Sequence, residues 1–288
     1  MTGSGPAVRL EQARRHYQRA KQRQTLLAAV LAILAFGLAI PAGGFSLERL
    51  IAGFPQITAY VGSTLPVIRP DHLGEDLAEW YWGIGRYLRL MADTVLMAYL
   101  GTLLGLMGAL ALAFPASANL TRWPLLRFLC RRILEFARGV PELVYALIFV
   151  FAFGIGPVPG VLALAVHSMG ALGKLFSEVN ENLDDRAIAG VTATGASWFA
   201  VMRFAVTPQV LPNYASYTLF RFEINVRSAS VLGFVGAGGI GQELYTSIRS
   251  FSYTDVSAIV LVIVAMVSLT DLASQTIRTR FLDRESMA

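Results

Sequence analysis

The sequence predicts an all-α membrane protein with about six transmembrane helices. Of its 288 residues, 55% are hydrophobic and only 15% are charged, whereas a typical soluble domain has about 25% charged residues. The apolar residues gather in runs that approach the roughly 20 residues a helix needs to cross the hydrocarbon. Lysine and arginine lie beside these runs and not in one stripe, which is typical of segments held at a membrane surface.

The apolar runs predict six spans in chain order. They are 25–40, 92–114, two spans within 140–172, then 214–235 and 256–272. The run 140–172 is too long for one span and carries five glycine and proline residues between 154 and 160, so we expect two helices joined by a tight turn. A cleaved signal peptide is the alternative for the first run, but the basic flank before it is unusually long.

Basic residues in the short flanks predict the orientation, because they are retained in the cytoplasm. Six of them against one glutamate precede the first span, and five arginines against one glutamate separate the second from the third. We therefore expect both termini inside, although the slightly acidic segment 174–211 departs from the rule. The parts are a basic cytoplasmic segment 1–24, the first helix 25–42, an external loop or interfacial segment 43–90, five spans in 91–280 and a cytoplasmic tail 281–288.

Several function classes are disfavoured by composition. The lone cysteine, Cys130, excludes an internal disulfide, and three scattered histidines predict no metal site. The basic residues lack the interleaved aromatic pattern of a nucleic-acid interface. No G-x-x-x-x-G-K-[ST] phosphate loop occurs, so the chain is not expected to hydrolyse ATP itself.

The segment between the fourth and fifth spans predicts a short helix-turn-helix. Small residues up to Thr194 favour one helix, Gly195 favours a turn, and 198–204 favours a second helix that ends before Pro208. Such a hairpin is either a docking surface for another protein or an ordinary interfacial hairpin. Spacing alone does not distinguish these two interpretations.

The fifth span carries Arg221, Glu223, Asn225 and Arg227, which are costly in hydrocarbon and should face protein or a watery path. At 100° per residue, Glu223 and Arg227 share one face and can neutralise each other, while Arg221 and Asn225 lie nearly opposite. Arg221 has no acidic partner at helical spacing. Because guanidinium is the complement of an oxyanion, we expect these four residues to line a translocation pathway.

A glycine cluster follows this span in the sequence GAGGIG at 236–241. It matches G-x-G-x-x-G, but a dinucleotide site needs a βαβ unit and an acidic residue about 20 positions further on. Close helix packing or a flexible external gate is the better interpretation. The residues concerned are Gly236, Gly238, Gly239 and Gly241.

Six separate blocks resemble the permease of phosphonate importers of the ATP-binding-cassette (ABC) class. They are RGVPELVYAL at 138–147, LGKLFSE at 172–178, ATGAS at 193–197, PQVLP at 208–212, RFEINVR at 221–227 and VGAGGIGQE at 235–243. The resemblance runs from about Met91 to the C-terminus. It implies a type I importer permease core in 91–280 with a cytoplasmic coupling loop at about 184–212.

The resemblance also implies partners. These are a second permease chain in a homodimer or heterodimer, two cytoplasmic ATPase subunits that hold ATP and Mg, and an external substrate-binding protein, all at a bacterial inner membrane with both termini cytoplasmic. This chain would bind no cofactor and no nucleic acid, and its other neighbour would be membrane lipid. The implied substrate is phosphonate or a related oxyanion such as phosphate or phosphite, which the sequence does not separate.

The coupling loop departs from the family pattern at one position. The implied coupling residues are Ala189, Ala193, Thr194, Gly195, Ala196, Ser197 and Pro208. Ala189 stands where the family usually has glutamate, so Glu181, Asp184 or Asp185 could substitute for it, or a partner permease could keep the glutamate.

The alternatives to an importer subunit are an ATPase-independent secondary transporter of a small anion, which often shows inverted repeats, and a membrane enzyme, which needs converging catalytic groups. Neither signal is visible in the sequence.

Overall fold

The computed structural model describes residues 6–44 and 46–285. It divides the chain into two units, 1–62 and 63–288, which are described separately. Every regular element in the described residues is helical, as the composition predicts.

The first unit contains α1 (Pro6–Ala42) and most of α2 (Leu47–Thr64). The apolar part of α1, Tyr17–Ile40, has no buried residue. Leu31 is 59% exposed and Phe36 is 71% exposed. A helix that exposes large apolar side chains along its whole length is suited to hydrocarbon, so the first predicted span is present as a helix.

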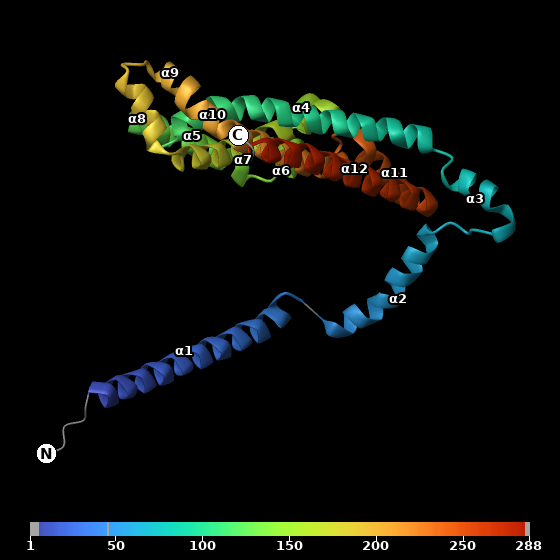
Figure 1. Cartoon of the computed structure of the whole chain (residues 1–288). Helices are drawn as coiled ribbons and strands as arrows, with labels where there is room; N and C mark the ends of the chain where they lie inside the picture. Colours follow the sequence, from blue (N-terminus) through green and yellow to red (C-terminus); the bar gives the residue numbers. More distant parts are fainter. Residues whose placement is uncertain (1–5, 45, 286–288) are drawn as a thin grey trace. The chain divides into compact units, whose positions relative to one another are not determined.

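The second unit is a helical bundle (Figure 1). Its elements are a 3₁₀ turn (Pro70–His72), α3 (Leu73–Trp80), α4 (Ile84–Ala116), α5 (Pro124–Gly139), α6 (Glu142–Phe153), α7 (Pro157–Glu181), α8 (Asp185–Ala193), α9 (Trp198–Val201), a π-helical turn (Met202–Val206), α10 (Thr207–Leu232), a second 3₁₀ turn (Gly233–Val235), α11 (Gly239–Arg249) and α12 (Tyr253–Glu285).

The most extensive helix contact in the bundle is between α4 and α7, and glycine allows the two helices to approach closely. A Cβ at Gly101 would lie 2.6 Å from Leu164 Cβ, and one at Gly105 would lie 2.6 Å from Ser168 Cβ. Glycines four apart allow two backbones to approach closely in a membrane. This contact brings the polar residue Ser168 into the middle of the bundle.

The third span is bent, which differs from the straight helix expected to begin at Val140. The helix α6 has only 12 residues, too few to cross a bilayer alone. It forms a broken span with α5 across an 89° bend. Gly139 ends α5 and Pro141 precedes α6, and the residue before a proline is pushed out of the helical conformation.

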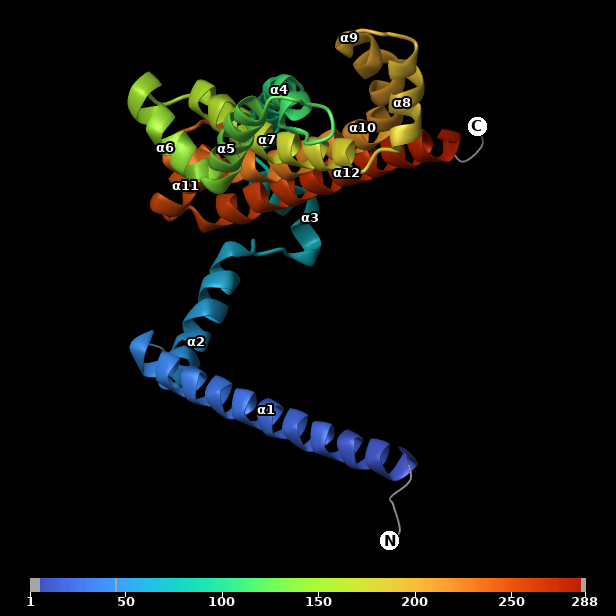
Figure 2. The ribbon, with the colours of Figure 1, turned by 90° about the vertical axis from the view of Figure 1, so that its left-hand side faces the viewer.

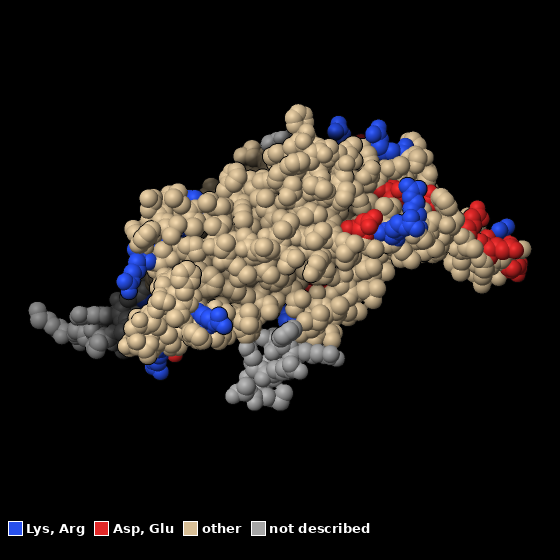
Figure 3. All heavy atoms as spheres, turned by 90° about the horizontal axis from the view of Figure 1, so that it is seen from above, with Lys and Arg blue, Asp and Glu red and all other residues tan. Residues whose placement is uncertain are grey.

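Four described helices are long and apolar enough to cross a membrane, or five if the bent pair counts as one span. The helix α10 is 26 residues long but carries Arg221, Glu223 and Arg227. It is not among these helices, so length and hydropathy mark four or five spans in the described residues where the sequence predicts about six. The middle of the bundle surface is largely uncharged, and charged side chains gather toward its two ends (Figure 3). An uncharged band between charged ends is the surface that a bilayer requires.

The two ends of the bundle carry different elements. At one end α8 and α9 project beyond the neighbouring helices (Figure 2). The opposite end carries α3, the connections 154–156 and 233–238, and the start of α12 (Figure 1). The helix α10 runs from the first end toward the second, and its charged residues lie between them.

Candidate functional site

A polar belt crosses the bundle halfway along α10. Arg221 is 8% exposed and Asn225 is fully buried. Arg221 Nε donates to Ser168 Oγ at 3.0 Å, and Asn225 Nδ2 donates to the same Ser168 oxygen at 2.8 Å. Asn225 Nδ2 also donates to Thr102 Oγ1 at 2.8 Å. These bonds tie α10 to both members of the close α4–α7 pair.

The belt holds buried polar atoms that lack a partner. Within the part of the chain that the structure describes, they are Arg221 Nη2, Asn225 Oδ1 and Asp271 Oδ1. The orientation of the Asn225 amide is fixed, because Thr102 Oγ1 gives its own proton to Ala98 O at 2.7 Å and must accept from Asn225. Each unpaired buried group costs about 1–3 kcal/mol. Groups left unpaired at such a cost commonly mark a functional site.

On one side of Arg221 the belt continues to α6 and α7. Ser228 Oγ donates to Glu142 Oε1 at 2.6 Å. His167 Nδ1 lies 3.0 Å from Val140 O and 3.6 Å from Glu142 Oε2. Glu142 therefore links the start of α6 to α10 and lies beside His167 of α7.

On the opposite side of α10 the predicted Glu223–Arg227 pair is present. Arg227 Nη2 lies 3.8 Å from Glu223 Oε1 and 3.6 Å from Asp271 Oδ2 of α12. The Arg227 side chain is 56% exposed. A charged group exposed on a spanning helix must face protein or water. The two polar faces predicted for the fifth span are thus both found, and Asp271 is added to one of them.

The sequence analysis missed Thr102, Ser168 and Asp271 as members of the belt. Each lies in a separate helix, and no spacing rule within one helix connects it to α10. The available signal was the presence of a polar side chain inside an apolar run. That signal does not say which helix such a side chain meets.

The glycine cluster forms a tight connection between α10 and α11. Gly236, Gly238 and Gly239 have φ of 89°, 79° and 72°, a left-handed backbone that disfavours other residues. A Cβ at Gly241 would lie 2.0 Å from Ser230 O. Gly156 N donates to Gly236 O at 3.0 Å, which joins this connection to the α6–α7 turn. The cluster lies between helices, and no described residue forms a strand, so the dinucleotide interpretation has no structural support.

The predicted hairpin is present between α7 and α10, and we define it as residues 185–206. Gly195 has φ of 78° and makes the turn. Asp184 Oδ1 accepts from Arg186 N at 2.9 Å at the start of α8, and Ser197 Oγ accepts from Ala200 N at 3.4 Å at the start of α9. Of the proposed coupling residues, Ala196 is half-buried. The other six are exposed: Ala189, Ala193, Thr194, Gly195, Ser197 and Pro208.

The prediction that the second helix of the hairpin ends before Pro208 is wrong. The helix continues from α9 through the π-helical turn into α10, where Pro208 occupies the first turn. The π-helical turn lies directly before the proline, and Thr207 N donates to Met202 O across it. Two side chains add bonds to backbone carbonyl groups here: Thr207 Oγ1 donates to Met202 O at 2.8 Å, and Gln209 Nε2 donates to Ala205 O at 2.5 Å.

Two of the three acidic substitutes suggested for the missing glutamate are engaged inside the chain. Glu181 forms an ion pair with Arg131 and accepts from Ala118 N at 2.7 Å. Asp184 caps α8. The Asp185 side chain lies outside the described residues. Glu181 and Asp184 thus each have an internal partner, and their substitution for a glutamate at the position of Ala189 stays a prediction.

No group of three or more potential metal ligands occurs in the described part of the chain. The belt is a set of hydrogen-bonding and charged groups inside a helical bundle, and it is suited to binding and passing a small polar solute.

The family model described as "binding-protein-dependent transport system inner membrane component" matches residues 101–285, which include the belt and the hairpin. The chain belongs to this family. The phosphite transport system permease protein PtxC of Stutzerimonas stutzeri is 38% identical over 252 residues, 86% of this chain and 87% of the relative. The phosphate-import permease protein PhnE of Mycolicibacterium smegmatis is 42% identical over 194 residues, 67% of this chain and 36% of the relative.

Solved structures give the same fold at lower sequence identity. A chain of the MetNI methionine ABC transporter in an inward-facing conformation has a TM-score of 0.59 at 19% identity, covering 67% of this chain and 95% of that chain. A chain of a bacterial ABC transporter involved in the import of alginate has a TM-score of 0.59 at 13% identity, covering 92% and 99%. The fold is that of ABC importer permeases, as the sequence blocks predict.

Proposed function

We propose that this chain is the transmembrane permease subunit of an ABC importer for phosphonate or a related phosphorus oxyanion. The observation that carries the substrate class is the buried, unpaired Arg221 Nη2 in the middle of a membrane-spanning bundle. Guanidinium binds oxyanions through strong charge-assisted hydrogen bonds. The names of the phosphite and phosphate permeases that this chain resembles support the same class.

The translocation pathway runs along α10 in this proposal. Arg221 and Asn225 offer an unused donor and an unused acceptor on one face. The other face of α10 carries the charged groups Glu223 and Arg227, with Asp271 of α12 beside them. Because the Arg227 side chain is exposed, it must contact water or another protein chain within the membrane. A second permease chain against this face would enclose a watery path between the two chains. The pair can be a homodimer or a heterodimer.

The hairpin is the proposed docking surface for a cytoplasmic ATPase, which would hold ATP and Mg. Its exposed small residues allow close approach, and Phe199 beside them is 78% exposed, an apolar group that a partner could cover. This orientation puts both termini in the cytoplasm and the α3 end outside. An external binding protein would then deliver solute at the end that holds α3 and the glycine connection.

The test is reconstitution of the chain in lipid vesicles with its own ATPase and binding protein. Uptake of phosphite, methylphosphonate and phosphate is measured with and without ATP and the binding protein. The expected result is uptake that requires both, with at least one phosphorus oxyanion stimulating ATP hydrolysis. Uptake driven by an ion gradient without the ATPase would overturn the proposal in favour of a secondary transporter.

The docking surface has its own test. Replacing Gly195, whose φ is 78°, with valine strains the turn and adds bulk to the proposed contact. We expect loss of ATPase copurification and of coupled transport. The matched control is Gly53→Val on α2, outside the hairpin, where no atom lies within 4 Å of an added Cβ. Full copurification and transport by the Gly195 variant would rule out this surface.

A further inference from the structure

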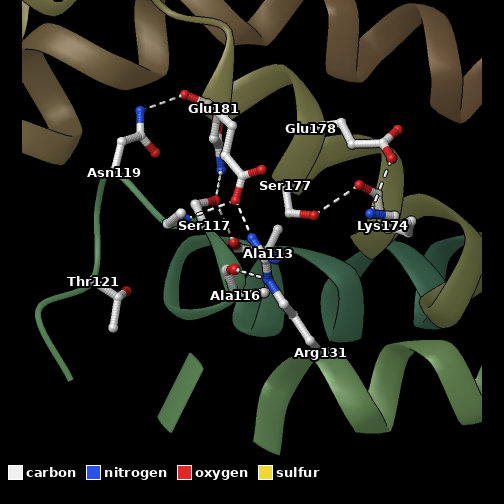
Figure 4. A network of polar contacts seen from close by, with 12 residues as sticks. Ala113, Ala116, Ser117, Asn119, Thr121, Arg131, Lys174, Ser177, Glu178 and Glu181 are labelled. Atoms are coloured by element: carbon white, nitrogen blue, oxygen red, sulfur yellow. Dashed lines mark hydrogen bonds and ion pairs between the residues drawn. The ribbon is translucent and has the colours of Figure 1, made fainter. Parts of the chain in front are cut away.

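The end of α7 next to the hairpin is held in a polar network (Figure 4). Glu181 Oε1 accepts from Ala118 N at 2.7 Å and forms an ion pair with Arg131. Arg131 Nε also donates to Ala116 O at 2.8 Å. One carboxylate therefore joins three parts of the chain: the end of α7, the middle of α5, and the connection 117–123 between α4 and α5, which we call the linker.

A second set of bonds connects the same parts to α10. Tyr214 Oη donates to Asn180 Oδ1 at 2.7 Å, and Asn180 Nδ2 donates to Ser117 Oγ at 3.0 Å. Asn119 Nδ2 donates to Asn180 O at 2.7 Å. Asn180 is fully buried, and the ring of Tyr214 is stacked on Phe176 with centroids 3.8 Å apart. The network is thus anchored in the apolar core at this end of the bundle.

The hairpin meets the linker directly. Trp198 Nε1 donates to Leu120 O at 2.9 Å. A cavity of about 930 Å³ remains between the hairpin and the linker, lined in part by Thr121, Trp123 and Ile188. The hairpin therefore touches the bundle mainly through its ends and through Trp198. A displacement of the hairpin reaches the linker through Trp198, and it reaches α7 through the three residues between Glu181 and α8.

We propose that Glu181 and Asn180 are positioning residues for energy coupling: they make α7, the linker, α5 and α10 follow the hairpin as one body when the ATPase moves it. The inference rests on the proposed function. The bonds of Asn180 are buried or partly buried, and those of Glu181, although exposed, join separate elements of the fold. Bonds in a connected, buried network are stronger and more cooperative than isolated bonds within one helix. The Lys174–Glu178 pair joins residues four apart on one helix at 3.0 Å, with side chains 34% and 49% exposed, so it contributes little.

The experiment compares Glu181→Ala, Tyr214→Phe and the control Glu178→Ala in vesicles that contain the full transporter with its ATPase and binding protein. Phosphite uptake and ATP hydrolysis are measured on the same samples, and their ratio is the readout. Tyr214→Phe removes only one hydroxyl and keeps the stacked ring, so it should fold even if Glu181→Ala does not.

We expect ATP hydrolysis to persist in Glu181→Ala and Tyr214→Phe while phosphite transported per ATP falls about fivefold or more, a size typical of coupling between sites. The control should keep the wild-type ratio. An unchanged ratio in Tyr214→Phe, or an equal fall in Glu178→Ala, would overturn the inference. A wild-type transporter that takes up no phosphorus oxyanion with ATP would instead contradict the proposed function itself.

Discussion

Replacement of Arg221 by glutamine should separate stability from transport. The wild-type guanidinium gains one charge-assisted hydrogen bond to Ser168, worth about 1.5–3 kcal/mol. It also leaves Nη2 buried without a partner, which costs about 1–3 kcal/mol. The two quantities nearly cancel, and the glutamine amide can still donate to Ser168. We therefore expect the midpoint of thermal unfolding to shift by no more than about 4 °C.

Transport should respond very differently to the same substitution. If Nη2 binds the passing oxyanion, glutamine loses a charge-assisted hydrogen bond of about 1.5–3 kcal/mol, which corresponds to a fall of roughly 10- to 150-fold in the rate of uptake. The assay is phosphite uptake by the reconstituted transporter, with thermal unfolding followed in parallel. The matched control is Arg132→Gln, whose side chain is 57% exposed and pairs only with Glu135, three residues away.

Two results would refute this reasoning. Unchanged phosphite uptake would show that Arg221 makes no contact with the solute that matters for transport. A large fall in the unfolding midpoint, with a matching loss of assembled transporter, would show that Arg221 is a structural residue whose bond to Ser168 outweighs its unpaired nitrogen.

Gly241→Ala should prevent normal packing of α11, because the added Cβ would lie 2.0 Å from a backbone carbonyl oxygen of α10. We expect little monodisperse protein when this variant is purified in detergent. The control Gly190→Ala adds a Cβ in open space and should give as much folded protein as the wild type. Normal yield and stability of the Gly241 variant would contradict the tight contact. Arg69 bonds the Asp76 carboxylate with its side chain and backbone N–H, which lowers the pKa of Asp76. The bond therefore stabilises the segment 66–80 above the unfolded pKa of about 3.9, and this contribution is lost as pH falls through the lowered pKa. Hydrogen exchange in 66–80 should accelerate in that acidic range in the wild type, and Asp76→Asn should exchange quickly at neutral pH as well; equal rates for both proteins at neutral pH would refute the assignment.

The apolar runs predicted most of the fold because helix length and hydropathy are local properties of the sequence. The bend between α5 and α6 was missed because the arginine-rich segment before residue 140 was assigned to the connection between two spans. The continuation through Pro208 was missed for a different reason. The helix passes Pro208 directly after the π-helical turn Met202–Val206, and residue spacing does not predict such a turn.

The candidate site was predictable only in part. Contacts between residues of one helix could be predicted from the sequence, whereas contacts between different helices could not. The Glu223–Arg227 pair lies four residues apart on one helix, so helical spacing predicted it. The partners of Arg221 and Asn225 come from other helices, so they depend on how close α4, α7 and α10 pack. Polar residues inside apolar runs mark these positions as unusual, but only the packed bundle identifies their partners.

The belt and the network at the end of α7 both include α7 and α10, and their bonding differs in a way that fits transport. In the belt, buried donors and acceptors on Arg221 and Asn225 are left unused, so a solute can bind there without breaking all existing bonds. At the end of α7, Asn180 uses both side-chain atoms and its carbonyl oxygen. A fully bonded region can carry displacement without deforming, whereas a partly bonded one can exchange protein contacts for solute contacts. A displacement of the hairpin would therefore move the bonded end of the bundle as one unit. The contacts that change would be those of the belt, because its donors and acceptors are only partly used.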